Sequence, residues 1–140
     1  MKVKFKKLSD KAVTPFKGTQ GSAGFDITAT GREIDGVNKL IEYSTDIAIA
    51  IPEGYVGLIF PRSSVYKTQL SLSNSVGVID SDYRGEIRFK FNYNIMHVHP
   101  YEVGDRVGQL VIVPIPDVEL VESDLDDTDR GEGGFGSTGK

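Results

Sequence analysis

The 140-residue sequence contains no cysteine and no tryptophan. The absence of cysteine excludes disulfides and thiolate-ligated metals. No apolar run approaches the length of about 18 residues that a membrane-spanning helix needs. The basic segment 1–10 is not followed by the apolar stretch of a signal peptide. We therefore expect a protein of the cytoplasm, or of the host cytoplasm if the source is viral, that makes no contact with a membrane.

Positive charge is also limited, because 16 Lys and Arg residues stand against 20 Asp and Glu residues, for a net charge of −4. A nucleic-acid-binding domain usually presents a basic stripe. The charge balance therefore argues against a nucleic-acid partner, but it does not exclude a small phosphorylated ligand. The length indicates one domain that is large enough to bury a core.

Helical periodicity is missing as well, apart from one short candidate at 63–69. Three segments instead show the period-2 alternation of half-buried strands: 47–51, 56–60 and 87–93. Turn-forming residues separate the strands at 52–54, 80–85 and 102–105. The apolar run 109–115 is typical of a strand buried on both faces. Many short strands with very little helix predict an all-β sandwich, jelly roll or barrel.

The composition changes after about residue 123. Residues 124–140 begin with four aspartates among their first six positions and end in a glycine-rich stretch. Such a segment cannot bury enough apolar surface to fold alone. We therefore predict a body, residues 1–123, followed by an acidic hinge and a flexible arm, residues 124–140. The match of 134–140 to a Walker A loop is coincidental, because a P-loop follows a strand and opens a helix, whereas here an acidic linker precedes it.

The arm nevertheless has features that suit a phosphorylated aromatic ligand. Phe135 is an isolated aromatic among glycines, and Arg130 opens the segment. Ser137 and Thr138 stand between glycines that allow the backbone to approach a ligand closely. The alternative, a solvated tail, is the commoner outcome for such a composition, but these three features fit it poorly.

Within the body, Asp80 directly follows the apolar run 76–79, where a strand would end. A carboxylate held there can act as a general base toward water, although a β-turn rich in Asp and Gly is the simpler explanation. The segment PRSS at 61–64 offers a guanidinium fork and hydroxyls suited to phosphate oxygens. Its alternative is a polar turn or a helix N-cap.

Two further polar residues interrupt apolar strands. Asp26 lies within AGFDITA, and a buried carboxylate needs a partner, either an arginine or a metal-bound water. Gln109 stands at the start of an apolar strand, which is also an ordinary entry from a turn. His97 and His99 flank Val98 on one face, and we treat them as surface residues because two ligands do not make a metal site.

Five segments occur in a characteristic order: AGFDITA (23–29), PRSS (61–64), NSVGVIDSDYRGE (74–86), GDRVGQ (104–109) and RGEGGFGSTG (130–139). In text and spacing they resemble the five motifs of the trimeric dUTPase family. The resemblance covers nearly the whole chain, and its third and fifth motifs are highly specific. It implies a jelly-roll or distorted β-barrel subunit, assembled as a homotrimer with active sites at subunit interfaces. It also implies Mg²⁺-assisted hydrolysis of dUTP to dUMP and pyrophosphate, which keeps uracil out of DNA and supplies dUMP for dTMP synthesis.

The resemblance also implies roles for single residues. Asp80 corresponds to the general base that activates water for in-line attack on the α-phosphorus. Tyr83 corresponds to the ring that lies under the deoxyribose and leaves no room for a 2′-hydroxyl. The uracil would be read by Asn74 and by the hairpin residues Gly77, Val78 and Ile79. Asp26 would contact the metal only through water, because Mg²⁺ takes its ligands mainly from the substrate phosphates and from water.

The remaining substrate contacts come from two groups of residues. Resemblance to the second and fourth motifs assigns phosphate contacts to Ser63, Ser64 and Gln109. Arg62 lies where the family has an arginine associated with structure or with phosphate, and we include it among the substrate-binding residues. In the arm, Phe135 would stack over uracil, and the β and γ phosphates would meet Arg130, Gly136, Ser137 and Thr138. Mobile arms of this kind exclude water and complete a site when they close.

Two departures from the common family pattern are Ser64, where glycine is frequent, and Gly108, where alanine is frequent. Neither removes a catalytic group. One alternative function is that of the related dCTP deaminases, which need an active-site glutamate for ammonia loss. Another is a catalytically idle nucleotide sensor, against which the intact set of site residues argues.

Overall fold

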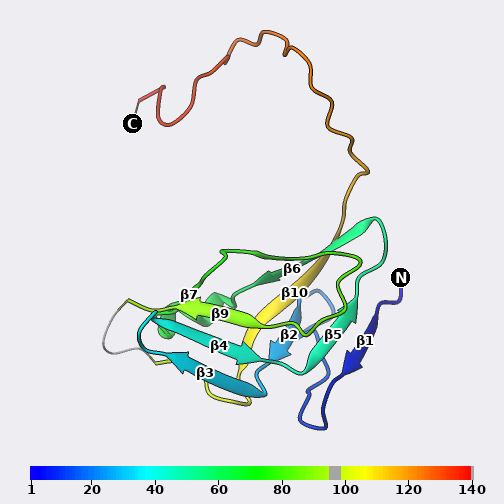
Figure 1. The fold of residues 1–140 in the computed structure, drawn as a ribbon, viewed down its shortest axis with the longest axis vertical. Helices are drawn as coiled ribbons and strands as arrows, with labels where there is room; N and C mark the ends of the chain where they lie inside the picture. Colours follow the sequence, from blue (N-terminus) through cyan, green and yellow to red (C-terminus); the bar gives the residue numbers. More distant parts are fainter. Residues whose placement is uncertain (95–98, 140) are drawn as a thin grey trace.

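The structure is a computed structural model that describes residues 1–94 and 99–139. Its one short helix is the 3-10 helix η1 (Ser63–Lys67), within the predicted range 63–69 (Figure 1). The strands are β1 (Lys4–Lys7), β2 (Phe25–Thr28), β3 (Gly31–Asp35), β4 (Leu40–Ser44), β5 (Ile47–Ala50), β6 (Tyr55–Phe60), β7 (Ser71–Leu72), β8 (Gly77–Ile79), β9 (Phe89–Asn92) and β10 (Arg106–Pro114). The predicted all-β fold with very little helix is therefore confirmed.

The strands form two four-stranded antiparallel sheets and one smaller pair, as in a jelly roll. One large sheet has the order β2-β10-β6-β8 and the other has the order β3-β4-β9-β7, while β1 pairs with β5. This topology brings distant motifs together. Because β2 pairs with β10, Asp26 of the first motif lies opposite Gln109 of the fourth.

The core is one buried cluster to which both large sheets contribute. Its aromatic part includes Tyr43, Phe89 and Phe91, which are fully buried. The rings of Tyr43 and Phe91 meet edge to face, with their centroids 5.9 Å apart. Burial raises the pKa of Tyr43 to about 12, so its hydroxyl stays protonated at neutral pH and donates to the carbonyl of Tyr101 at 2.9 Å. The alternation of 87–93 thus places two of these rings inside the core, as predicted.

The outer face of the β2-β10-β6-β8 sheet is apolar but only partly covered. The outward residues of β6 are Val56, Leu58 and Phe60. Beside the first two in register lie Val78 of β8 and Val111 and Val113 of β10. Val78 remains 61% exposed. We predicted that the run 109–115 is buried on both faces. In the described part of the chain its outward face is only partly buried.

Gly108 departs from the alanine that is frequent at this position in the family pattern, and the core explains the departure. A Cβ atom built on Gly108 would lie 2.0 Å from Cε1 of Phe89. The large ring of Phe89 therefore fills the space that an alanine methyl would need.

We expect Gly108→Ala to lower the free energy of unfolding by about 1–3 kcal/mol, the range typical of an overpacked core. Urea denaturation would measure the change. Adding Phe89→Leu to Gly108→Ala should recover part of the loss, because the smaller side chain leaves room for the methyl group. A Gly108→Ala variant as stable as the parent protein would contradict this explanation.

After β10 the chain leaves the sheets. Figure 1 shows the C-terminal segment running away from the strands and curling near its end. The N–H of Ile115 donates to the carbonyl of Gly54 at 2.9 Å. Beyond it, hydrogen bonds in the described residues 116–139 join arm residues only to one another. The boundary at residue 123 remains a prediction, since the last strand already ends at Pro114.

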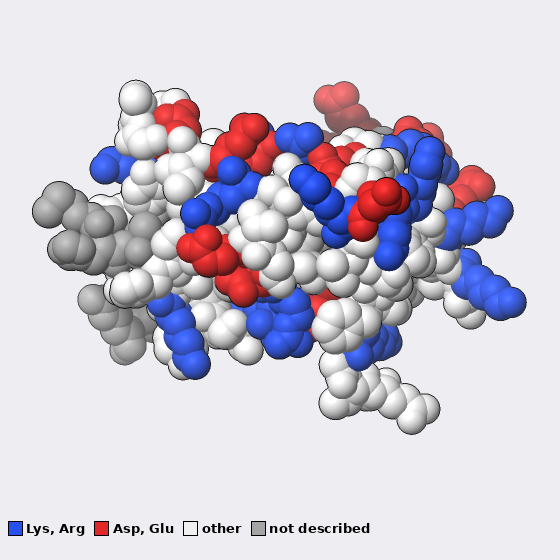
Figure 2. All heavy atoms as spheres, turned by 90° about the horizontal axis from the view of Figure 1, so that it is seen from below, with Lys and Arg blue, Asp and Glu red and all other residues white. Residues whose placement is uncertain are grey.

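The surface carries charges of both signs. On the face shown in Figure 2, basic and acidic side chains are interspersed and do not merge into a basic stripe. This arrangement agrees with the expectation that nucleic acid is not a partner, which remains a prediction. In the described part of the chain, no helix is long and apolar enough to cross a membrane.

Candidate functional site

A hollow of about 310 Å³ beside β8 collects the predicted residues of the third motif. Asp80 follows the end of β8 directly, as the sequence pattern predicts. The predicted residues that line the hollow are Asn74, Gly77, Val78, Ile79, Asp80 and Tyr83. A carboxylate, an aromatic ring and the backbone of the 74–79 segment therefore face the same small volume, which is large enough for part of a nucleotide.

The segment 74–79, predicted as a hairpin, is a tight turn and strand that leads from one sheet to the other, because β7 pairs with β9 and β8 pairs with β6. Ser75 has a positive φ of 61°, and its N–H donates to the carbonyl of Leu72 at 3.0 Å. A Cβ atom on Gly77 would lie 2.3 Å from Cγ1 of Ile59. Glycine therefore lets β8 pack closely on β6, which fixes the backbone polar groups at the rim of the hollow.

Tyr83 is held in place by its own loop. Its hydroxyl donates to the carbonyl of Glu86 at 3.0 Å, and its N–H donates to the carbonyl of Asp80 at 3.2 Å. The ring lies against Gly85, where a Cβ atom would come within 2.5 Å of Cζ. The ring of Tyr83 thus has a defined position relative to the backbone of Asp80.

A second cluster lies where β2, β10 and the start of η1 meet. Asp26 accepts a hydrogen bond from Nε of Arg62 at 3.1 Å on one oxygen and from Nη1 of Arg106 at 3.0 Å on the other. The predicted arginine partner of Asp26 is therefore present. Arg106 is a second partner that our sequence reasoning did not single out, although it lies within the quoted segment GDRVGQ. The side-chain amide of Gln109 donates to the carbonyl of Pro61 at 3.2 Å.

The residues around this cluster are polar and partly exposed. Ser63 is exposed and Ser64 is half-buried, and both open η1 directly after Arg62. Gly24 packs against the amide of Gln109, where a Cβ atom would come within 2.8 Å of Oε1. Two guanidinium groups, two hydroxyls and an amide are thus gathered in a form suited to phosphate oxygens.

Asp80 and Arg62 lie at opposite ends of β6. Strand β8 runs antiparallel to β6 with Ile79 opposite Gly57, so Asp80 lies level with the start of β6. Arg62 follows its end. At about 3.3 Å per residue, this places Asp80 roughly 20 Å from Arg62. A single chain therefore separates Asp80 from the predicted phosphate contacts, although Gly77 lies opposite Ile59 near the end of β6.

The third group of predicted residues lies in the arm. The predicted members that surround a hollow of about 580 Å³ are Arg130, Phe135, Gly136, Ser137 and Thr138. Nε of Arg130 donates to the carbonyl of Gly133 at 2.8 Å. Phe135 has a positive φ of 53° and a fully exposed ring. The arm thus presents an aromatic face, a guanidinium group and two hydroxyls, away from both clusters of the body.

The donor set near Asp26 fits a water-mediated contact with Mg²⁺. Each carboxylate oxygen accepts one guanidinium hydrogen bond and keeps a lone pair for a further donor, such as a metal-bound water. Within residues 1–94 and 99–139, no three His, Asp or Glu side chains gather as direct ligands. His99 is exposed, and His97 lies outside the described residues.

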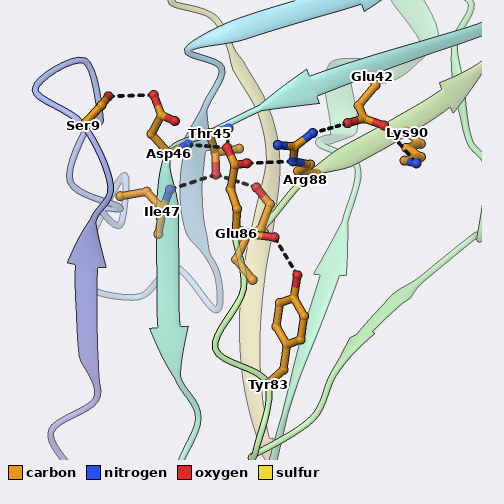
Figure 3. A network of polar contacts seen from close by, with 10 residues as sticks. Ser9, Glu42, Thr45, Asp46, Ile47, Tyr83, Glu86, Arg88 and Lys90 are labelled. Atoms are coloured by element: carbon orange, nitrogen blue, oxygen red, sulfur yellow. Dashed lines mark hydrogen bonds and ion pairs between the residues drawn. The ribbon is translucent and has the colours of Figure 1, made fainter.

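A charged network that sequence reasoning missed borders the hollow beside β8 (Figure 3). Arg88 and Lys90 line the hollow and pair with Glu42 at 2.6 Å and 2.9 Å. The hydrogen bonds from Lys90 and Arg88 hold the pKa of Glu42 below its usual value. Glu86 accepts a further hydrogen bond from Arg88 at 2.6 Å. The only sequence signal for this network was the polar side of the alternating segment 87–93.

Comparison with known proteins identifies what this arrangement is similar to. The family model described as dUTPase matches residues 10–139. A probable deoxyuridine 5′-triphosphate nucleotidohydrolase from Schizosaccharomyces pombe is 46% identical over 136 residues, which cover 95% of each chain. The deoxyuridine 5′-triphosphate nucleotidohydrolase of Paramecium bursaria Chlorella virus 1 is 42% identical, over 96% of this chain and 95% of its own.

Solved structures give the same result. The dUTPase of Staphylococcus bacteriophage 80alpha, in complex with dUpNHpp, superposes with a TM-score of 0.80 at 32% identity and covers 99% of both chains. A mutant dUTPase from the Staphylococcus aureus phage phi11 superposes with a TM-score of 0.76 at 28% identity, over 89% of this chain and 98% of its own. That structure reveals the coordination of a structural Mg(II) ion.

Proposed function

The chain belongs to the dUTPase family, and on this basis we propose that it is a dUTP diphosphatase that hydrolyses dUTP to dUMP and pyrophosphate. The observation that carries the proposal is the hollow in which Asp80, Tyr83 and residues of the 74–79 segment meet. A nucleoside fits there with its sugar on the ring of Tyr83 and its base on the 74–79 segment. In the cell, this reaction keeps uracil out of DNA and supplies dUMP for dTMP synthesis.

Asp80 supplies the base for the chemical step. Its carboxylate is exposed at the end of β8 and takes a proton from a water molecule. The water oxygen attacks the α-phosphorus in line, a bond forms between them, and the bond from the α-phosphorus to the bridging oxygen of the β-phosphate breaks. Pyrophosphate leaves with that oxygen, and dUMP keeps the new one.

The other residues act by positioning and by charge neutralisation, which dominate catalysis of phosphoryl chemistry. Arg62, Ser63, Ser64 and Gln109 hold the phosphates. Asp26 would hold Mg²⁺ through water, and the ion would supply neutralisation of charge on the phosphate oxygens. The arm then closes, with Phe135 over the base and Arg130, Gly136, Ser137 and Thr138 at the β and γ phosphates.

We propose that the chain works as a homotrimer. Two observations support this assembly: the predicted phosphate contacts lie at the opposite end of β6 from Asp80, and the arm residues lie far from both. A complete site therefore needs residues from neighbouring copies. The outward apolar residues of β6, β8 and β10, among them the exposed Val78, offer a surface for such contacts. Sedimentation equilibrium should give three times the mass of the 15.3 kDa chain; a monomer at assay concentration would contradict the assembly.

The proposed activity is tested by pyrophosphate release from dUTP in the presence of Mg²⁺. The result expected is rapid release with dUTP and little with dCTP, dTTP or UTP. Ammonia release from dCTP at a matching rate would instead indicate a deaminase. Folded protein that binds dUTP without turnover would indicate the nucleotide-sensor alternative.

The cytoplasmic location remains a prediction, since two of the relatives are mitochondrial by name.

A further inference from the structure

We propose that Glu86 is a positioning residue. It holds the ring of Tyr83 in the position under the sugar that is required to discriminate dUTP from UTP. The inference rests on the proposed function and concerns a residue that contacts neither phosphate nor base in that proposal. Glu86 connects the third-motif loop to the turn between β4 and β5 (Figure 3). It is also one of the residues that line the hollow beside β8.

The carboxylate of Glu86 is fully engaged by that turn and by its neighbour on the next strand. Oε1 accepts hydrogen bonds from the N–H groups of Thr45 at 3.0 Å and Asp46 at 2.9 Å. Oε2 accepts from Nε of Arg88 at 2.6 Å. The side chain is only 13% exposed. Charge-assisted hydrogen bonds are stronger than neutral ones, so this carboxylate anchors residue 86 firmly to the β4–β5 turn.

The backbone around Glu86 is fastened to the same turn. Glu86 forms an isolated β-bridge with Ala48, and the N–H of Ile87 donates to the carbonyl of Ile47 at 2.8 Å. The hydroxyl of Thr45 donates to the carbonyl of Ile87. Side chain and backbone thus fix the peptide group of residue 86 from both sides.

This fixed peptide group is the acceptor for Tyr83. The Tyr83 hydroxyl donates to the carbonyl of Glu86 at 3.0 Å, while the rest of the loop, at Asp82 and Arg84, is exposed. The far end of the ring is therefore positioned by the β4–β5 turn through Glu86. If the contacts of Glu86 with the β4–β5 turn are lost, the ring of Tyr83 can move away from the sugar. Space then opens where a 2′-hydroxyl would lie.

The charge network alone does not explain this arrangement, and Glu42 separates the two roles. Glu42 pairs with Arg88 and Lys90, as Glu86 does with Arg88, but in the described structure it has no hydrogen bond to Tyr83 or to the β4–β5 turn. Substitution of either carboxylate therefore removes a charge pair with Arg88. Only substitution of Glu86 also releases the ring of Tyr83.

The test compares kcat/KM for dUTP and UTP in Glu86→Ala, Glu86→Asp, Glu86→Gln and the control Glu42→Gln, together with thermal stability. Glu86→Ala should reduce the dUTP-to-UTP ratio of kcat/KM by about tenfold or more, since steric rejection of an added hydroxyl is weak unless the site is well defined. Glu86→Gln keeps an oxygen acceptor for the turn and should restore most of the ratio. Glu42→Gln should lower thermal stability and leave the dUTP-to-UTP ratio of kcat/KM unchanged.

Two outcomes would overturn the proposal: a Glu86→Ala variant with reduced thermal stability but an unchanged ratio, or a Glu42→Gln variant with an equal loss of the ratio. Glu86→Asp covers the case in which the alanine variant does not fold, because its carboxylate withdraws by one methylene and the ratio should still fall. Dissociation constants for dUMP and UMP are measured in parallel. If the parent protein shows no dUTP turnover, the proposed function fails, and the Glu86 inference stands or falls on whether the dUMP-to-UMP preference declines in the variants.

Discussion

Replacement of Asp80 by asparagine is expected to lower kcat for dUTP hydrolysis by about 10²–10⁴-fold, the contribution typical of a positioned general base. The amide has nearly the shape of the carboxylate but cannot take a proton from water at neutral pH. Because Asp80 is exposed beyond the end of β8, the substitution should leave the fold unchanged. Stopped-flow measurement of pyrophosphate release would give the rate.

Two controls make the Asp80 result specific. Calorimetry should show that the asparagine variant still binds dUTP, since the 74–79 segment and Tyr83, which are proposed to hold the nucleoside, are intact. Asp82→Asn removes a charge two residues away, at an exposed position outside the nucleoside hollow, and should turn over at nearly the parent rate. If the Asp80 variant itself retained a near-normal rate, the base would lie elsewhere in the site.

The local features of the fold were predictable because they follow from periodicity and turn chemistry. The alternation of 87–93 placed Phe89 and Phe91 in the core, and the polar segment after Ile79 ended β8 where Asp80 begins. The turn-length candidate at 63–69 became η1. In each case the information lies in a few neighbouring residues.

The contacts that tie the site together were not predictable in this way. The pair between Asp26 and Arg106 joins residues 80 positions apart, and Glu86 reaches back 41 positions to the N–H of Thr45. Such pairings depend on strand order, which a single sequence leaves open. The half-covered face of β6 and β10 was misjudged for a related reason: an apolar run looks the same whether its second face meets its own chain or a neighbouring subunit.

Deletion of residues 130–140 is expected to leave a folded trimer that hydrolyses dUTP at least about 10²-fold more slowly, since loss of even one preorganised donor to a developing charge costs about this much. The fold should persist because the described arm residues hydrogen-bond only to one another. The rate should fall because the deletion removes the stacking ring and the phosphate-binding groups together, and it also leaves the site open to water. Steady-state kinetics and sedimentation would check the two expectations separately.

Point variants distinguish closure of the arm from a general effect of shortening the chain. Phe135→Ala removes a fully exposed ring, so it cannot weaken the core, and it should raise KM through the lost stacking on the base. Leu125→Ala is the matched control, because Leu125 is 92% exposed in the same arm and has no proposed ligand contact. Parent-like kcat/KM in the deletion variant would refute the closing role of the arm. Equal losses in Phe135→Ala and Leu125→Ala would show that the arm acts through its conformation as a whole and that the ring itself does not stack on the base.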